Sequence, residues 1–232
     1  MAAAAAHGEW TPARSVAGRR NPWTIIAVIS IATFMVVLDT SIANVALQHI
    51  AGGLAASYDE STWVITSFLV ANAVIVPISG WLADVIGRKR YYMISVALFT
   101  GASLLCGLAP SLGFLVVARV LQGIGGGGLA PVEQSMMVDT FPPAKRGAAF
   151  AAYGVVVIVG PILGPTLGGW ITDNLSWHWV FLINLPVGLL SLFLVTIFVE
   201  EPPALRKERR KLLSKGLRID WQGFVLLALF LG

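Results

Sequence analysis

Long apolar runs separated by short polar or charged segments dominate this chain. Each run holds close to the roughly 20 residues that an α-helix needs to cross the hydrocarbon core of a bilayer. The alternation of polar and apolar residues that a membrane barrel requires is absent, whereas helices satisfy their backbone hydrogen bonds internally. The pattern therefore predicts an all-α, polytopic membrane protein with six spans, at about residues 23–46, 61–83, 91–109, 114–137, 147–171 and 180–199.

These runs and the segments between them divide the chain into four regions. Residues 1–21 are Ala-rich and then basic, so we expect a disordered tail. Residues 22–199 hold the six-helix bundle, and residues 200–220 form a highly charged linker. Residues 221–232 begin a seventh apolar run that is too short to cross a membrane, so we expect the chain to stop inside a helix.

Composition narrows the class of protein. Hydrophobic residues make up 56% of the chain and charged residues only 12%, about half the charged share of an ordinary soluble domain. The net charge of +4 does not indicate nucleic acid as a partner, because the basic residues lie beside apolar spans without a nucleic-acid-binding motif. The single cysteine, Cys106, lies in an apolar run, so no disulfide framework and no thiolate metal site is expected.

The distribution of basic residues predicts the topology. Fifteen of the sixteen Lys and Arg residues fall on alternate loops or on the two charged ends, and the loops between them carry none. By the positive-inside rule, the N-terminus and the long linker are cytoplasmic. We therefore expect a multi-pass protein of the inner (plasma) membrane. The sixteenth basic residue, Arg119, lies inside the fourth predicted span.

Asp39 is the one charged residue of the first predicted span. A charge within a span is costly unless it is paired or faces water, which makes Asp39 and Arg119 functional candidates. Antiparallel spans place both residues at similar depth, about seven residues from Ala46 and Leu112 respectively. We hypothesise that they pair, and that protonation of Asp39 disrupts the pair and moves the helices. A purely structural buried pair is the alternative.

A polar stripe follows the fourth predicted span. At 100° per residue, Gln122, Gly126 and Glu133 lie within about 60° of Arg119, so we expect this stripe to face a cavity. Glu133 lies near the cytoplasmic end of the span. It could attract a cationic substrate, exchange protons or simply be an interfacial residue, and the sequence leaves these alternatives open.

Small residues recur in the fifth predicted span. Gly160, Gly164 and Gly168 repeat every four residues and predict a smooth face for close packing of another helix. Pro161 and Pro165 lack backbone donors and should bend the span.

The stretch between the second and third predicted spans resembles the loop signature of the major facilitator superfamily. It reads Gly-Trp-Leu-Ala-Asp-Val-Ile-Gly-Arg-Lys, and Val85 stands where a basic residue is usual. Glycines permit a tight reversal, and an aspartate can pair with nearby bases. The resemblance implies a cytoplasmic gate loop formed by Gly80, Asp84, Gly87, Arg88 and Lys89.

Three further stretches are similar to motifs of the fourteen-helix drug:proton antiporters (EmrB/QacA type) within that superfamily. The first runs from Leu38 to Leu47 and includes Asp39 and Asn44, and the second is the R-x-x-Q-G sequence at residues 119–123. The third is the antiporter motif of the fifth helix, carried by Gly160, Pro161, Gly164, Pro165, Gly168 and Gly169. Together these motifs cover nearly the whole chain in the order of the family.

This resemblance implies the N-terminal half of a proton-coupled multidrug efflux transporter that exports hydrophobic, often cationic compounds by alternating access. Asp39 and Arg119 would couple to protons, while Gln122, Glu133 and Asn44 would line the substrate cavity. The proton gradient would replace any cofactor or metal. Membrane lipid and a C-terminal half would be partners, with a periplasmic adaptor in some members, and the glycine face would pack on a helix of that second half.

Other functions stay open at this level. A metabolite or peptide exporter of the same fold differs only in its substrate, and a non-transporting membrane sensor or scaffold would not need charges inside the spans. An enzyme is not expected, because no Ser/His or metal-ligand cluster lies in spans that could face each other.

Overall fold

The computed structural model describes residues 21–201, 204–206 and 209. Apart from Asn21, the predicted N-terminal tail lies outside this part of the chain. Most of the predicted linker and all of residues 221–232 also lie outside it.

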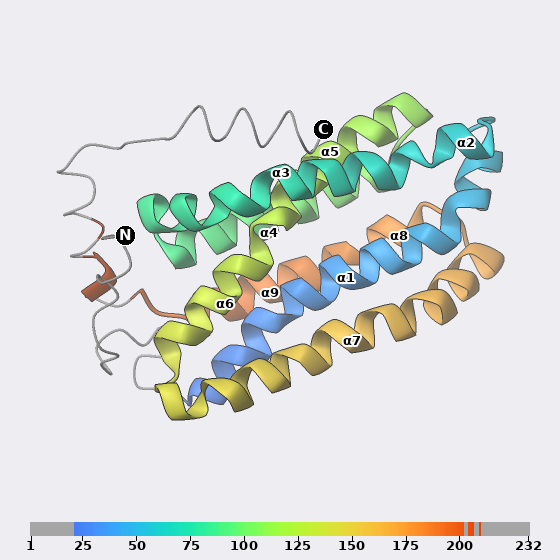
Figure 1. The fold of residues 1–232 in the computed structure, drawn as a ribbon. Coiled ribbons are helices and arrows are strands. Elements are labelled where there is room, and N and C mark those ends of the chain that lie inside the picture. Colours follow the sequence, from blue (N-terminus) through green and yellow to red (C-terminus); the bar gives the residue numbers. More distant parts are fainter. Residues whose placement is uncertain (1–20, 202–203, 207–208, 210–232) are drawn as a thin grey trace.

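All regular structure in the described residues is helical, so the all-α prediction is confirmed. The short helices α2 and α8 lead directly into α3 and α9, and α5 leads into α6, which gives six rods (Figure 1). The helices are α1 (Pro22–Gly53), α2 (Tyr58–Ser61), α3 (Trp63–Ile86), α4 (Arg88–Gly107), α5 (Leu112–Gly127), α6 (Leu129–Thr140), α7 (Pro143–Asn174), α8 (Trp179–Leu182) and α9 (Asn184–Phe198).

Five of these rods are long and apolar enough to cross a membrane, judged by length and composition. The rod that falls short is α4, the third predicted span. It begins with three basic residues, and its buried face carries Ser95, Thr100 and Ser103, which lowers its hydropathy. Its 20 residues still match the thickness of a bilayer, and it lies packed between the other rods.

The first helix is longer than predicted. Asn21 caps it by accepting a hydrogen bond from the backbone N of Trp23 at 3.0 Å, and Pro22 occupies the first turn. The helix continues to Gly53, seven residues past the predicted end of the span at Ala46. Polar residues after that point mark the membrane boundary, whereas the helix itself ends only at a glycine pair.

The fourth predicted span is two helices rather than one. The helix is interrupted at Gly128, between α5 and α6. Pro131 has no backbone N–H with which to continue the hydrogen bonds of α5, which favours a break at this point. A Cβ atom at Gly128 would overlap the side chain of Tyr91, so α4 approaches the break closely.

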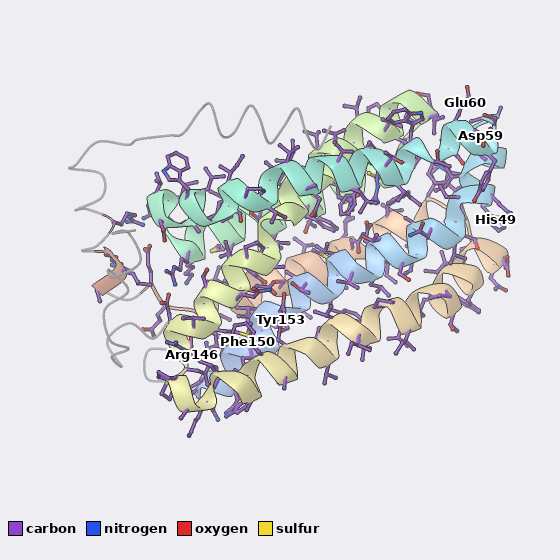
Figure 2. All side chains as sticks on the ribbon, viewed as in Figure 1. His49, Asp59, Glu60, Arg146, Phe150 and Tyr153 are labelled. Carbon is purple, nitrogen blue, oxygen red and sulfur yellow. The ribbon has the colours of Figure 1, made fainter. Side chains whose placement is uncertain are left out.

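The bundle has two chemically different ends. One end, called the basic end below, carries Arg88, Lys89, Arg90, Lys145 and Arg146. Figure 2 shows Arg146, Phe150 and Tyr153 toward this end and His49, Asp59 and Glu60 toward the opposite end.

Helix α1 is central to the packing. It lies beside α7 along most of its length and also contacts α9, while α5 packs between α3 and α4 (Figure 1). Two buried apolar clusters fill the bundle, one around Ile29 and Tyr92 toward the basic end and one around Ile42 and Phe181 toward the opposite end. Asp39 lies on α1 where the first cluster gives way to the second.

Large apolar side chains cover the outside of the bundle. In water such a surface would promote aggregation, whereas in a bilayer it contacts lipid or other membrane helices. Exposed examples are Ile94, Leu98, Val117, Val155, Ile158, Ile162, Leu189 and Phe193.

The glycine face of α7 packs on α1. A Cβ atom at Gly160 would lie 2.8 Å from Cγ1 of Val37, and one at Gly164 would overlap Ser41. The resemblance implied a partner in a second half of the transporter, and this implication is wrong for these glycines. They face inward because α1 and α7 are neighbours whose backbones approach closely.

Candidate site: a buried ion pair beside two cavities

The structure brings Asp39 and Arg119 together at the centre of the bundle. Nη1 of Arg119 on α5 donates to Oδ2 of Asp39 on α1 at 2.6 Å. Both side chains are 0% exposed. The pair is therefore shielded from water. In such an interior its electrostatic attraction is strong, and the loss of either partner is costly.

Two amides complete the coordination of Asp39. Nε2 of Gln122 and Nδ2 of Asn184 both donate to Oδ1 of Asp39, at 3.0 Å and 2.7 Å. Gln122 also accepts from Nη1 of Arg119 at 2.6 Å and donates to the hydroxyl of Ser103 at 2.7 Å. The network therefore connects α1, α4, α5 and α9 through one carboxylate.

Arg119 makes further contacts beyond the carboxylate. Its Nε donates to the carbonyl of Val64 at 2.9 Å, which connects the pair to α3. Its guanidinium carbon lies 4.2 Å from the ring centroid of Phe68 and 5.5 Å from that of Phe181. Such cation–π contacts stabilise a desolvated guanidinium.

Protonation of Asp39 would weaken this whole network. A neutral carboxylic acid binds the guanidinium and the two amides less strongly than a carboxylate does. Arg119 would then be a buried cation without a full counter-charge, which favours rearrangement of the helices that hold it. Loss of the charge on Asp39 would therefore destabilise the present arrangement of these helices.

One cavity adjoins the network through Phe68, and a second cavity continues from the first. The first, of about 410 Å³, is lined by Val36, Val37, Thr40, Ser41, Asn44, Phe68, Leu69, Asn72 and Pro161. The second, of about 390 Å³, is lined by Thr33, Val36, Val37, Asn72, Val76, Gly126, Gly127, Leu129, Ala130, Pro131 and Gln134. They share three lining residues and so follow one continuous surface of α1 and α3.

The predicted gate loop connects several rods at the basic end. Gly87 has a φ of 102°, a conformation that favours glycine. Arg88 forms ion pairs with Asp139 and, at 3.8 Å, with Asp84. Nζ of Lys89 donates to the carbonyls of Thr196 and Val199 at the end of α9. The loop thus joins α3 and α4 to α6 and α9.

Part of the linker contacts the same loop. Nη1 of Arg209 donates to the carbonyl of Ile86 at 2.9 Å and to Oε1 of Glu201 at 2.7 Å. A Cβ atom at Gly87 would overlap both of these side chains. Gly80 differs, because no described residue outside its own stretch of helix lies within 4 Å of the position that its Cβ would take.

A sequence model of the Major Facilitator Superfamily matches residues 29–232, almost the entire chain. This chain belongs to the Major Facilitator Superfamily. It is 52% identical over 161 residues to the multidrug export protein EmrB of Haemophilus influenzae, an alignment covering 69% of this chain and 32% of that protein. It is 46% identical over 204 residues to EmrB of Escherichia coli K12, covering 88% and 38%.

A third relative carries a different substrate in its name. The chain is 50% identical over 174 residues to the fatty acid resistance protein FarB of Neisseria gonorrhoeae, covering 75% of this chain and 34% of that protein. The prediction of an EmrB-type member of the superfamily is confirmed by these relatives. The chain spans about one third of the length of these relatives.

Solved structures of superfamily transporters share the fold. The partially occluded, inward-open xylose transporter XylE of Escherichia coli matches with a TM-score of 0.71 at 16% identity, covering 90% of this chain and 57% of that one. The peptide transporter POT (E310Q mutant) with sulfate matches with a TM-score of 0.70 at 19% identity, covering 95% and 48%. At these identities the likeness shows the fold of the chain alone.

In this superfamily bundle, the predicted cavity residues lie in different places. Asn44 lines the first cavity, whereas Gln122 and Glu133 are fully buried and are absent from the linings of both cavities. Glu133 packs inside the bundle, so an interfacial position is wrong for it. Contact of Gln122 and Glu133 with a substrate stays a prediction, as does the proton-coupling role of Asp39 and Arg119.

Several polar residues of this site received no role from the sequence. Asn184 and Ser103 join the Asp39 network, and Asn72 lines both cavities. Each interrupts a predicted apolar span with a hydrogen-bonding side chain, which is the signal that could have identified them. Their partners could not be inferred, because no helix neighbours were known.

Proposed function

We propose that this chain forms the N-terminal half of a proton-driven exporter of hydrophobic, often cationic compounds that works by alternating access. The observation that carries the proposal is the fully buried pair of Asp39 and Arg119 beside a cavity. A charge pair inside a membrane bundle is costly to bury, and a reversible role in proton binding explains its presence. The names of the relatives, multidrug export proteins, support the same class of substrate.

Phe68 provides the physical contact between the proton site and the cavity. Its ring lies over the guanidinium of Arg119, and it also lines the first cavity. A compound bound there would contact the ring that helps to stabilise Arg119. Binding of the compound and protonation of Asp39 therefore act on the same side chains, which is the requirement for exchange of one for the other.

The lining of the cavities suits hydrophobic compounds. Val36, Val37 and Leu69 supply apolar surface, while the amides of Asn44 and Asn72 supply a few hydrogen-bonding groups. The described residues that line the two cavities include no charged side chain. Selection of cations would therefore depend on a second half of the transporter, which would also complete the cavity.

The orientation follows from charge. We place the basic end in the cytoplasm and the protein in the inner (plasma) membrane, because Lys and Arg gather at that end. The proton gradient supplies the energy without a bound cofactor. The contacts of Arg88 and Lys89 with α6 and α9 would then form the cytoplasmic gate loop. Association with a periplasmic adaptor remains an expectation from the resemblance alone.

Proton release from the purified full-length transporter tests the function. Addition of a lipophilic cation to wild type in weakly buffered detergent solution should release protons, and Asp39→Asn should lower the number of protons released per bound cation. Asp59→Asn is the matched control, because Asp59 is exposed at the opposite end of the bundle. Full release by Asp39→Asn would disprove the role of Asp39, and binding without any release in wild type would disprove proton exchange.

A further inference from the structure

A second acidic residue, Glu133, is buried at a different level of the bundle. Its side chain on α6 is 0% exposed. Oε2 accepts a hydrogen bond from Thr33 Oγ1 at 2.6 Å, while Oε1 has no partner among the described residues. Thr33 lies six residues before Asp39, about 9 Å toward the basic end of α1. Glu133 is therefore separate from the Asp39 network.

Among the residues that the structure describes, the groups around Glu133 provide no counter-charge. The titratable groups that interact with Glu133 are the phenols of Tyr92 on α4 and Tyr153 on α7. Helix α1 contributes the neutral hydroxyl of Thr33. Arg119 lies fourteen residues earlier in the chain, about 20 Å away along the helix axis. A lone carboxylate with one unpartnered oxygen is very costly in such a site, whereas the protonated acid is neutral.

The hydroxyl groups beside Glu133 can serve both protonation states. Thr33 Oγ1 lies 2.9 Å from the phenol oxygen of Tyr153, and either group can donate in that contact. When Glu133 is ionised, Tyr153 donates to Thr33 and Thr33 donates to the carboxylate. When Glu133 is protonated, its own O–H donates to Thr33, which donates to Tyr153. Both hydrogen bonds are kept in each state, so the proton can be gained and lost reversibly.

The same threonine reaches a cavity. Thr33 lines the second cavity, as does Gln134, the neighbour of Glu133 in the sequence. We propose that Glu133 is a second protonation site, a neutral carboxylic acid in this conformation, which exchanges its proton with the second cavity through the hydroxyl of Thr33. The proposal deepens the proposed function by adding a proton carrier in the basic half of the bundle.

Release of this proton requires movement. The products are a proton in the cavity and an ionised Glu133, for which the described residues provide no ion pair. Ionisation therefore favours a state in which water or a cation reaches the carboxylate, and α1 and α7, which hold Thr33 and Tyr153 beside it, would shift against α6 to admit it. Protonation of two acidic residues at different depths, Asp39 on α1 and Glu133 on α6, would then act on the same helix, α1.

Infrared spectroscopy of the purified full-length transporter tests the protonation state without any transport. Wild type and Asp39→Asn should both show the carbonyl absorption of a buried, protonated carboxylic acid at neutral pH, and Glu133→Gln should lack it. Glutamine is a neutral mimic of the acid, so the melting temperature of this variant should stay close to that of wild type. Identical carbonyl absorption in wild type and Glu133→Gln would overturn the proposal.

The role of Thr33 is measured in the same spectra. After transfer to deuterated water, the absorption should shift as the acid exchanges its proton. This exchange should slow at least about tenfold in Thr33→Val, which has similar volume without a hydroxyl, and Thr33→Ser should restore it. Equal exchange rates in the Val and Ser variants would exclude the proposed path.

Transport measurements distinguish failure of this inference from failure of the proposed function, on which the inference rests. In proteoliposomes, Glu133→Gln should exchange one proton fewer per exported monovalent cation than wild type, which changes the response of export to membrane potential. Absence of any proton coupling in wild type would overturn the proposed function. Proton coupling in wild type with an unchanged proton count in Glu133→Gln would overturn the further inference alone.

Discussion

Phe68 and Arg119 form the contact through which a bound compound would sense the buried charge pair. The guanidinium carbon lies 4.2 Å from the ring centroid, and Phe68 is also among the residues that line the first cavity. A desolvated cation–π contact contributes about 2 kcal/mol. The ring therefore stabilises the ion pair and forms part of the surface that a substrate would cover.

Replacement of this ring should uncouple binding from proton release. Phe68→Leu keeps an apolar cavity wall but removes the cation–π contact, so we expect ligand affinity to change by less than tenfold while the protons released per bound ligand fall. Phe68→Tyr retains an aromatic face and should behave like wild type. Binding and proton release are measured together on the same purified samples, and equal proton counts for the Leu and Tyr variants would contradict this role.

Loss of one charge should destabilise the bundle more than loss of both. Arg119→Gln leaves Asp39 without a counter-charge in a fully buried site, which costs about 3–5 kcal/mol. The double variant Asp39→Asn with Arg119→Gln leaves no unpaired charge and should recover much of that stability. Thermal unfolding of the four proteins in detergent gives the coupling energy. Additive effects of the two substitutions would show that the pair is energetically independent.

The pairing of Asp39 with Arg119 could be anticipated because a charge inside an apolar span requires a partner and the two spans place both residues at similar depth. The helical fold could be predicted from the apolar runs, because helices satisfy their backbone hydrogen bonds internally. The other residues that contact Asp39 and Arg119 could not be anticipated. Asn184, for example, lies 145 residues from Asp39 in the sequence, and its contact depends on how α9 packs. Hydrophobic pattern gives the depth of a residue but not which helix it faces.

Glu133 shows the same limit. Its angular position relative to Arg119 was correct to first order, and both residues face the interior of the bundle. Gln122 and Glu133 lie eleven positions apart, about 16 Å along the span, so Gln122 contacts the Asp39 network while Glu133 contacts Thr33. A helical wheel gives the direction in which a residue faces, and it cannot distinguish a cavity wall from a buried helix interface.

The close approach of α1 and α7 predicts a strong difference between two glycines of one motif. A Cβ atom at Gly164 would overlap the side chain of Ser41, whereas no described residue outside the same stretch of helix lies within 4 Å of the Cβ position at Gly169. Gly164→Ala should therefore lower the free energy of unfolding by about 1–3 kcal/mol through overpacking. Gly169→Ala should leave it unchanged, as measured by thermal unfolding.

A second substitution tests the cause of that difference. Removal of the Ser41 side chain in the double variant Gly164→Ala with Ser41→Gly gives the new methyl group space on α1. The double variant should therefore regain at least part of the lost stability, beyond the effect of Ser41→Gly alone. No recovery would mean that Gly164 matters for a reason other than its contact with α1.

The gate loop offers a matched pair of glycines at its two ends. Gly87 has a φ of 102°, and a Cβ atom there would also overlap Glu201 and Arg209, whereas Gly80 is helical with open space at its Cβ position. Strain of this kind costs about 1–3 kcal/mol. Gly87→Ala should therefore loosen the contacts of Arg209 and slow export, and Gly80→Ala should preserve both.

Protease accessibility and transport distinguish these effects. Limited proteolysis of the region after α9 should be faster in Gly87→Ala, because Arg209 donates to the carbonyl of Ile86 directly before this glycine. Arg209→Gln should reproduce the faster cleavage with Gly87 intact, since it removes the same hydrogen bond and the pairing with Glu201. If Gly87→Ala slowed export while cleavage stayed at the wild-type rate, the glycine would act through the backbone of the loop rather than through Arg209.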